Sequence, residues 1–143
     1  MSFTSVTSFA TAQKPKEQFC GADCLYVALC GIPSETAPDR FSDLLGRLGK
    51  PNDKGYALAE LKTVATHYGT FAECMHVDYV TLEELVTRYQ VILHLASGHY
   101  VVCRQVGRDG VVVFDPSRGA TSISTEKMRA EWQGDCLIIS DSR

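Results

Sequence analysis

The stretch Gln18-Phe19-Cys20-Gly21-Ala22-Asp23-Cys24-Leu25 marks the point where a polar N-terminal segment turns into an apolar run. Apolar residues continue at helical spacing to Leu29, and Gly31 and Pro33 end the pattern, so the sequence predicts a buried helix with Cys20 in its first turn. A thiol in that place faces free backbone N–H groups and the positive end of the helix dipole, which favour a thiolate. Cys20 is therefore a candidate nucleophile, although many free cysteines are simply small buried residues.

The composition indicates one globular domain. The chain has 143 residues, of which 45% are apolar, and this is enough for a single core. We expect a flexible lead-in over residues 1–12 and one domain over residues 13–143. The net charge of −3 and the lack of a basic block argue against nucleic acid as a partner. The sequence shows no transmembrane segment and no signal peptide, which predicts a cytoplasmic protein whose six cysteines are reduced thiols.

The order of the predicted elements indicates an α+β fold. Helical patterns fill most of the first half, and β-branched runs fill most of the second half. Beyond the first helix, we expect helices over residues 39–48, 56–68, 81–88 and 124–132, and strands over residues 70–77, 91–96, 100–106, 111–114 and 136–140. The helix over 81–88 is predicted to start with a capping box formed by Thr81 and Glu84.

Two residues at strand ends are expected to lie close together. His99 comes just before one predicted strand, and Asp115 ends the next one, just before Pro116. The turn signal Gly107-Arg108-Asp109-Gly110 joins the two strands into a hairpin, so the start of one strand lies beside the end of the other. A histidine oriented by a carboxylate, near a thiol at a helix N-terminus, is the arrangement of an activated cysteine nucleophile. Asp115-Pro116 is also consistent with a plain turn.

These residues also carry a family resemblance. Cys20 to Leu25, Gly98-His99-Tyr100-Val101-Val102, Phe114-Asp115-Pro116 and Glu131-Trp132-Gln133-Gly134 resemble, in order and in spacing, the C39 family of papain-like cysteine peptidases. Domains of that family usually form the N-terminal part of bacteriocin-exporting ABC transporters and cut leader peptides after a double glycine.

The resemblance implies a papain-like fold with N-terminal helices packed on a C-terminal antiparallel sheet. It implies that Cys20 is the nucleophile, that His99 is the general base and acid, and that Asp115 fixes the imidazole. A glutamine before the cysteine normally helps to form the oxyanion hole, and the sequence offers Gln13, which we favour, and Gln18. The expected substrate is a peptide or precursor protein, and no cofactor or metal is required.

The sequence departs from the family pattern in two further respects. Phe19 precedes the cysteine where the family commonly has Asp, and no transporter portion is present, so we expect a stand-alone domain with a separate ABC transporter as a possible partner. Two other functions stay open: a catalytically weak module that binds leader peptides, and another papain-like thiol hydrolase or acyltransferase. A zinc site at Cys20 and Cys24 is disfavoured because no second ligand pair has the spacing that zinc requires.

Overall fold

The computed structural model describes residues 19–32 and 37–141. In this part of the chain the helices are α2 (Cys20–Cys30), α3 (Phe41–Leu48), α4 (Leu58–His67), α5 (Tyr79–Leu85) and α6 (Thr125–Glu131). The strands are β1 (Phe71–His76), β2 (Gln90–His94), β3 (Tyr100–Val106), β4 (Gly110–Asp115), β5 (Gly119–Ser124) and β6 (Asp135–Ser140). Among these helices, none is long and apolar enough to span a bilayer.

All the strands form one antiparallel sheet in the order β1-β6-β2-β3-β4-β5. The last strand, β6, therefore lies between β1 and β2, and it is buried along almost its whole length. Its alternate residues serve two cores: Leu137 and Ile139 pack on one face of the sheet, whereas Cys136 and Ile138 pack on the other. A period of two along the strand produces this division.

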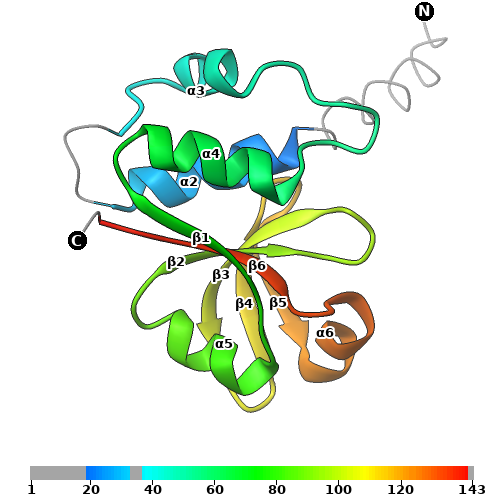
Figure 1. Cartoon of the computed structure of the whole chain (residues 1–143). Helices are drawn as coiled ribbons and strands as arrows, with labels where there is room; N and C mark the ends of the chain where they lie inside the picture. The colour runs from blue at the N-terminus through cyan, green and yellow to red at the C-terminus, as the bar shows by residue number, and fades with distance from the viewer. Residues whose placement is uncertain (1–18, 33–36, 142–143) are drawn as a thin grey trace, which may run out of the picture.

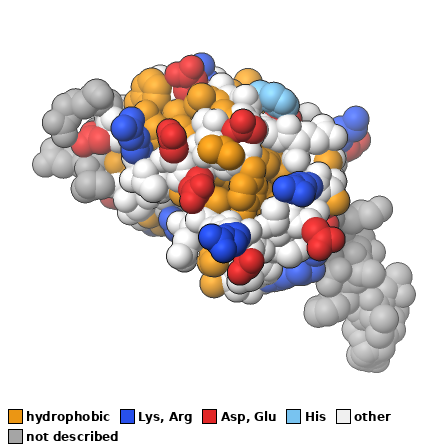
Figure 2. Space-filling view, turned by 90° about the horizontal axis from the view of Figure 1, so that it is seen from below, with side chains coloured by type: hydrophobic (Ala, Val, Ile, Leu, Met, Phe, Trp, Pro, Cys, Tyr) orange, Lys and Arg blue, Asp and Glu red, His pale blue; other side chains and the backbone are white. Residues whose placement is uncertain are grey.

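Helices cover both faces of the sheet. Figure 1 shows α2, α3 and α4 on one side and α5 and α6 on the other. The predicted packing of N-terminal helices on an antiparallel sheet is therefore confirmed. The layer formed by α5 and α6 is the smaller of the two, since these helices have seven residues each. Seen from that side, in Figure 2, apolar side chains are exposed at the centre of the face, among charged groups.

A glycine contact brings α2 close to the sheet. A Cβ added at Gly21 would lie 3.1 Å from the ring of Tyr100, the first residue of β3. The Tyr100 ring is fully buried, and its hydroxyl donates a hydrogen bond of 2.7 Å to the carbonyl oxygen of Tyr56. Because the ring is fixed in this way, the absence of a side chain at Gly21 sets how closely the start of α2 approaches β3.

Most predicted elements are present, with two corrections. The strand β5 was not predicted, because Gly119–Ser124 has only two apolar residues and alternates between half-buried and exposed positions. The capping box at Thr81 and Glu84 was wrong: α5 begins earlier, and the carboxylate of Asp78 caps it by accepting from the Thr81 N–H at 2.8 Å. The Thr81 N–H therefore donates to Asp78, and not to the Glu84 side chain as the capping box required.

Candidate active site

Cys20 is the first residue of α2, as predicted. The first hydrogen bond of the helix runs from the Asp23 N–H to the Phe19 carbonyl, so the N–H groups of the three preceding residues point out of its N-terminal end. Phe19, the residue before the helix, provides no side-chain cap. The Cys20 side chain is 4% exposed and packs in the core between helices and sheet. The thiol therefore lies at the positive end of a helix and at the edge of a core.

His99 lies in the tight turn that joins β2 to β3. The turn is closed by two backbone hydrogen bonds, from Gly98 N–H to Leu95 O at 2.8 Å and from Leu95 N–H to His99 O at 2.9 Å. Gly98 has a φ of +95°, a conformation that side chains other than glycine adopt only with strain. This glycine therefore explains why a Gly-His pair precedes the strand.

The expected proximity of His99 and Asp115 is confirmed. The His99 Nε2 atom lies 2.9 Å from Asp115 Oδ1, and the two side chains are 25% and 13% exposed. The strands β3 and β4 pair Val102 with Phe114, which places Asp115 opposite Val101 and on the same side of the sheet as His99. The hairpin turn closes with a bond from Gly107 N–H to Gly110 O at 2.8 Å, and a bulge between Cys103 and Gln105 then shifts the register by one residue, which brings Asp115 opposite Val101 instead of Val102.

Ser117 is a member of this cluster that the sequence analysis did not identify. Its backbone N–H and its hydroxyl both donate to Asp115 Oδ1, at 2.9 and 2.7 Å. Partial burial raises the pKa of Asp115, but the bonds from Ser117 and His99 outweigh it, so that the pKa lies below its usual value. The run Asp-Pro-Ser is typical of a turn in which the Asp side chain accepts from the backbone two residues later. Asp115 is thus both the turn residue and the partner of His99.

The pKa of His99 reflects its interaction with Cys20 as well as with Asp115. A hydrogen bond with the Cys20 side chain is the largest influence on the imidazole; burial opposes it, and the bond to Asp115 adds to it, which together raise the pKa of His99 to about 9. Because Nε2 is taken by Asp115, the nitrogen left for the sulfur is Nδ1. The imidazole is therefore charged at neutral pH and lies between a thiol and a carboxylate.

A second histidine and aspartate pair differs from this cluster in its exposure. His76 and Asp135 are also 2.9 Å apart, but their side chains are 71% and 52% exposed and no cysteine bonds to the ring. Such exposed pairs contribute little. His94 stacks on the Tyr100 ring at 4.3 Å, and burial lowers its pKa. Its place in the packing agrees with the structural role expected for it.

Other sequence-based expectations have mixed outcomes. All six cysteines are free thiols. The apolar surroundings of Cys30 in the sequence predict a buried side chain, but this prediction was wrong, because Cys30 is exposed at the end of α2. Cys24 is buried in the core, as expected. In residues 19–32 and 37–141, no three potential ligands are placed to hold a metal ion. Gln13 and Gln18, the candidates for the oxyanion hole, lie outside the described residues.

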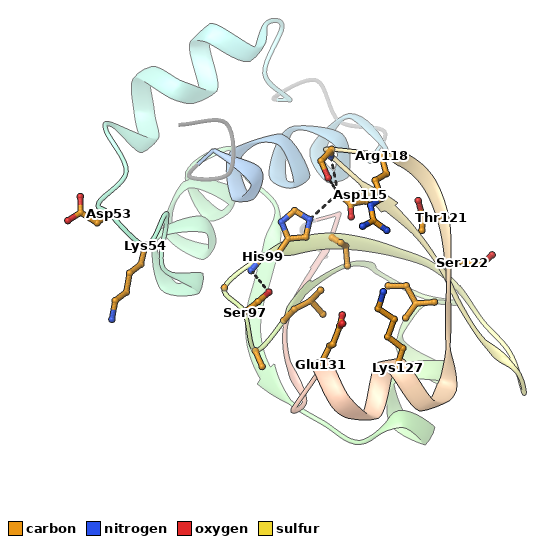
Figure 3. Close-up of a pocket in the computed structure, with 16 residues that line it drawn as sticks. Asp53, Lys54, Ser97, His99, Asp115, Arg118, Thr121, Ser122, Lys127 and Glu131 are labelled. Atoms are coloured by element: carbon orange, nitrogen blue, oxygen red, sulfur yellow. Dashed lines mark hydrogen bonds and ion pairs between the residues drawn. The ribbon is translucent and has the colours of Figure 1, made fainter. Parts of the chain in front are cut away.

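A cavity of about 1040 Å³ opens beside the pair formed by His99 and Asp115. Its walls come from the turn between β2 and β3, from β5 with the turn before it, from α6, and from Asp53 and Lys54 in the loop before α4 (Figure 3). Cys20 does not line it, because the thiol lies on the side of His99 that faces α2. The catalytic candidates therefore lie at the boundary between the core under α2 and an open cavity.

The family model of the Peptidase C39 family matches residues 9–143. The chain belongs to the Peptidase C39 family. A curated relative of this C39 chain is the colicin V secretion/processing ATP-binding protein CvaB of Escherichia coli, which is 31% identical over 123 residues. The match covers 84% of this chain but 16% of CvaB, so the chain corresponds to a small part of that protein.

Solved structures confirm the predicted fold. One is a double glycine motif protease from an AMS/PCAT transporter in complex with its leader peptide, with a TM-score of 0.73, 21% identity, and 85% of this chain and 84% of that chain covered. Another is the peptidase domain of Streptococcus ComA, a bi-functional ABC transporter, with a TM-score of 0.73, 19% identity, and 87% and 92% covered. The C39 chain thus has the α+β, papain-like fold of C39 peptidase domains.

Proposed function

We propose that this C39 chain is a cysteine peptidase in which Cys20, His99 and Asp115 form the catalytic triad. The observation that carries the proposal is the imidazole of His99, which lies 2.9 Å from Asp115 in a partly buried site and whose pKa is raised chiefly by its interaction with the Cys20 side chain. A thiol beside an oriented imidazolium is the usual form of an activated cysteine. Membership of a peptidase family supports the same assignment.

We assign a role in the reaction to each group of the proposed site. The Cys20 thiolate attacks the peptide carbonyl carbon, and the negative charge moves to the carbonyl oxygen. The Cys20 backbone N–H and the amide of Gln13, or of Gln18, hold this oxyanion. His99 gives its Nδ1 proton to the leaving amine as the C–N bond breaks, which leaves a thioester. His99 then takes a proton from water, which attacks the thioester and releases the carboxylate product and the thiolate.

Asp115 supports this cycle without exchanging a proton. Its carboxylate holds Nε2, which keeps the ring oriented with Nδ1 toward the sulfur. The two bonds from Ser117 fix the carboxylate in turn. We therefore assign Asp115 and Ser117 as positioning residues.

The substrate that we propose is a leader peptide cut after a double glycine. A structural relative is a double glycine motif protease bound to its leader peptide, and the relative CvaB is a secretion and processing protein. CvaB is a secretion and processing ATP-binding protein and ComA is a bi-functional ABC transporter, so we propose that this domain works with an ABC transporter. The six free thiols favour a reducing compartment, which supports a location in the cytoplasm.

The test is cleavage of synthetic leader peptides that contain a double glycine, with the products identified by mass. We expect a single cut after the second glycine, and no cut by Cys20→Ala, which keeps the fold because alanine fits the space of the thiol. As a control, Cys30→Ala, at an exposed position in the same helix, should keep full activity. Binding of the leaders without any cleavage by the unaltered protein would favour a peptide-binding module and refute the peptidase.

A further inference from the structure

The cavity beside His99 has the size and the lining to bind a polar segment of a peptide. Its volume of about 1040 Å³ is at the upper end of the usual range for ligand sites. Hydroxyl groups of Ser97, Thr121 and Ser122 line it together with the charged side chains of Arg118, Lys127 and Glu131. Apolar sheet residues form only a part of its wall, which favours a polar occupant in an extended conformation.

The proposed reaction decides which side of the substrate faces this cavity. The acyl half of the substrate becomes bonded to Cys20, which does not line the cavity. The amine half receives its proton from His99, which does line it. The amine nitrogen must therefore lie within hydrogen-bond distance of the imidazole, and the residues attached to it continue past His99.

Two cations that form no ion pair with other described residues face this space. Figure 3 shows the side chains of Arg118 and Lys127 reaching into the cavity from opposite walls, the first from the turn before β5 and the second from α6. Of the acidic groups that line the cavity, Asp115 is already held by His99 and Ser117, and Glu131 lies on α6 with Lys127. Asp53 lies with Lys54 on another wall, away from Arg118 and Lys127 in Figure 3.

We infer that this cavity binds the segment that follows the cleaved bond, and that Arg118 and Lys127 select an acidic side chain among its first residues. This inference rests on the proposed peptidase function and specifies its leaving-group side. Partly exposed ion pairs contribute at most about 1 kcal/mol each, or about fivefold in an equilibrium. Two such pairs give acidic segments an advantage of up to about 25-fold in kcat/KM over basic ones.

The experiment compares three peptides that share one leader ending in a double glycine and differ only in the next three residues: Asp-Asp-Ala, Ala-Ala-Ala and Lys-Lys-Ala. The expected order of kcat/KM follows that list, and Lys127→Glu should reverse the order of the first and third peptides. Lys127 is the third residue of α6, where an acidic side chain suits the helix dipole, so the change spares the fold. Arg129→Glu makes the same charge change on α6 outside this cavity and should keep the original order.

A binding measurement makes the test independent of turnover. The peptide Asp-Asp-Ala is titrated into Cys20→Ala and into Cys20→Ala with Lys127→Glu, and amide shifts of Ser97 and Ser122 are followed by NMR. Shifts in the first protein that weaken in the second support the inference. Equal kcat/KM for the three peptides, or no shifts at these amides, would overturn it while the peptidase stands. Shifts without any cleavage by the unaltered protein would overturn the peptidase and keep the anionic peptide site.

Discussion

The replacement Asp115→Asn tests the electrostatic argument for the triad most directly. The amide keeps the size and an oxygen acceptor for His99 Nε2, but it removes the negative charge that lies 2.9 Å from the ring. Two unit charges about 4 Å apart interact by about 4 kcal/mol at an effective dielectric constant of about 20. The two side chains are 25% and 13% exposed, so water partly screens their interaction. We therefore take about half of that energy, about 2 kcal/mol, as the contribution of the Asp115 charge. At about 1.4 kcal/mol per unit, the pKa of His99 should fall by about 1 to 2 units.

The assay is an NMR titration of protein labelled with ¹⁵N-histidine, in which the His99 signal is assigned by its loss in His99→Gln. In the unaltered protein the signal should titrate near the pKa of about 9 that its bonds produce. Cys20→Ser should lower that pKa further than Asp115→Asn does, because the bond to Cys20 is the largest influence on the ring. Asp135→Asn removes the carboxylate of the exposed pair and should leave His99 unchanged.

The reasoning fails if the His99 pKa in Asp115→Asn stays within about 0.3 units of that in the unaltered protein. It also fails if Cys20→Ser has the smaller effect of the two, because the thiol would then not be the main partner of the ring. A change in Asp135→Asn as large as that in Asp115→Asn would show that net charge, and not the local pair, sets the pKa.

Three further predictions use other measurements. Cleavage of a double-glycine leader peptide should decline above about pH 9, because His99 then loses the proton that the leaving amine needs; a rate that is constant to pH 10.5 would contradict this. Iodoacetamide at pH 5.5 should modify Cys20 before the other five cysteines, as judged by peptide mass, and equal labelling would remove it as the nucleophile. Gly46→Ala, in open space on α3, should stabilise the protein by up to about 1 kcal/mol, whereas Gly21→Ala meets the Tyr100 ring and should cost about 1 kcal/mol in urea unfolding; equal effects would refute the close contact.

The sequence was informative about the site where local chemistry alone determines the geometry. The hairpin between β3 and β4 follows from a four-residue turn with a glycine at each end, and a hairpin turn fixes the register of its strands. Counting outward from Gly107 and Gly110 therefore places Asp115 near the start of β3, and a bulge between Cys103 and Gln105, which the sequence did not reveal, turns it to the face of His99. The start of α2 was equally local, because the polar-to-apolar change at Cys20 is visible in the sequence.

Other features depend on partners that lie far away in the chain. The insertion of β6 between β1 and β2 joins strands separated by more than forty residues, and an apolar run does not state which strands will flank it. The strand β5 forms because β4 offers its edge and the turn after Asp115 returns the chain, although its own residues have a weak strand pattern. The Asp-Pro-Ser turn could have predicted the bond from the Ser117 N–H, whereas the second bond, from its hydroxyl, depends on a rotamer that the sequence does not specify.

The contact between Cys20 and His99 is of a third kind, because it joins two layers of the fold. His99 and Asp115 belong to one hairpin and keep their distance as long as that hairpin forms. Cys20 reaches the ring only if α2 packs on β3 at the distance that Gly21 and the buried Tyr100 ring permit. Changes in core packing between helices and sheet should therefore reduce alkylation of Cys20 before they disturb the bond between His99 and Asp115. His99 and Asp115 are brought together within one hairpin, whereas Cys20 reaches them only through the packing of α2 on the sheet.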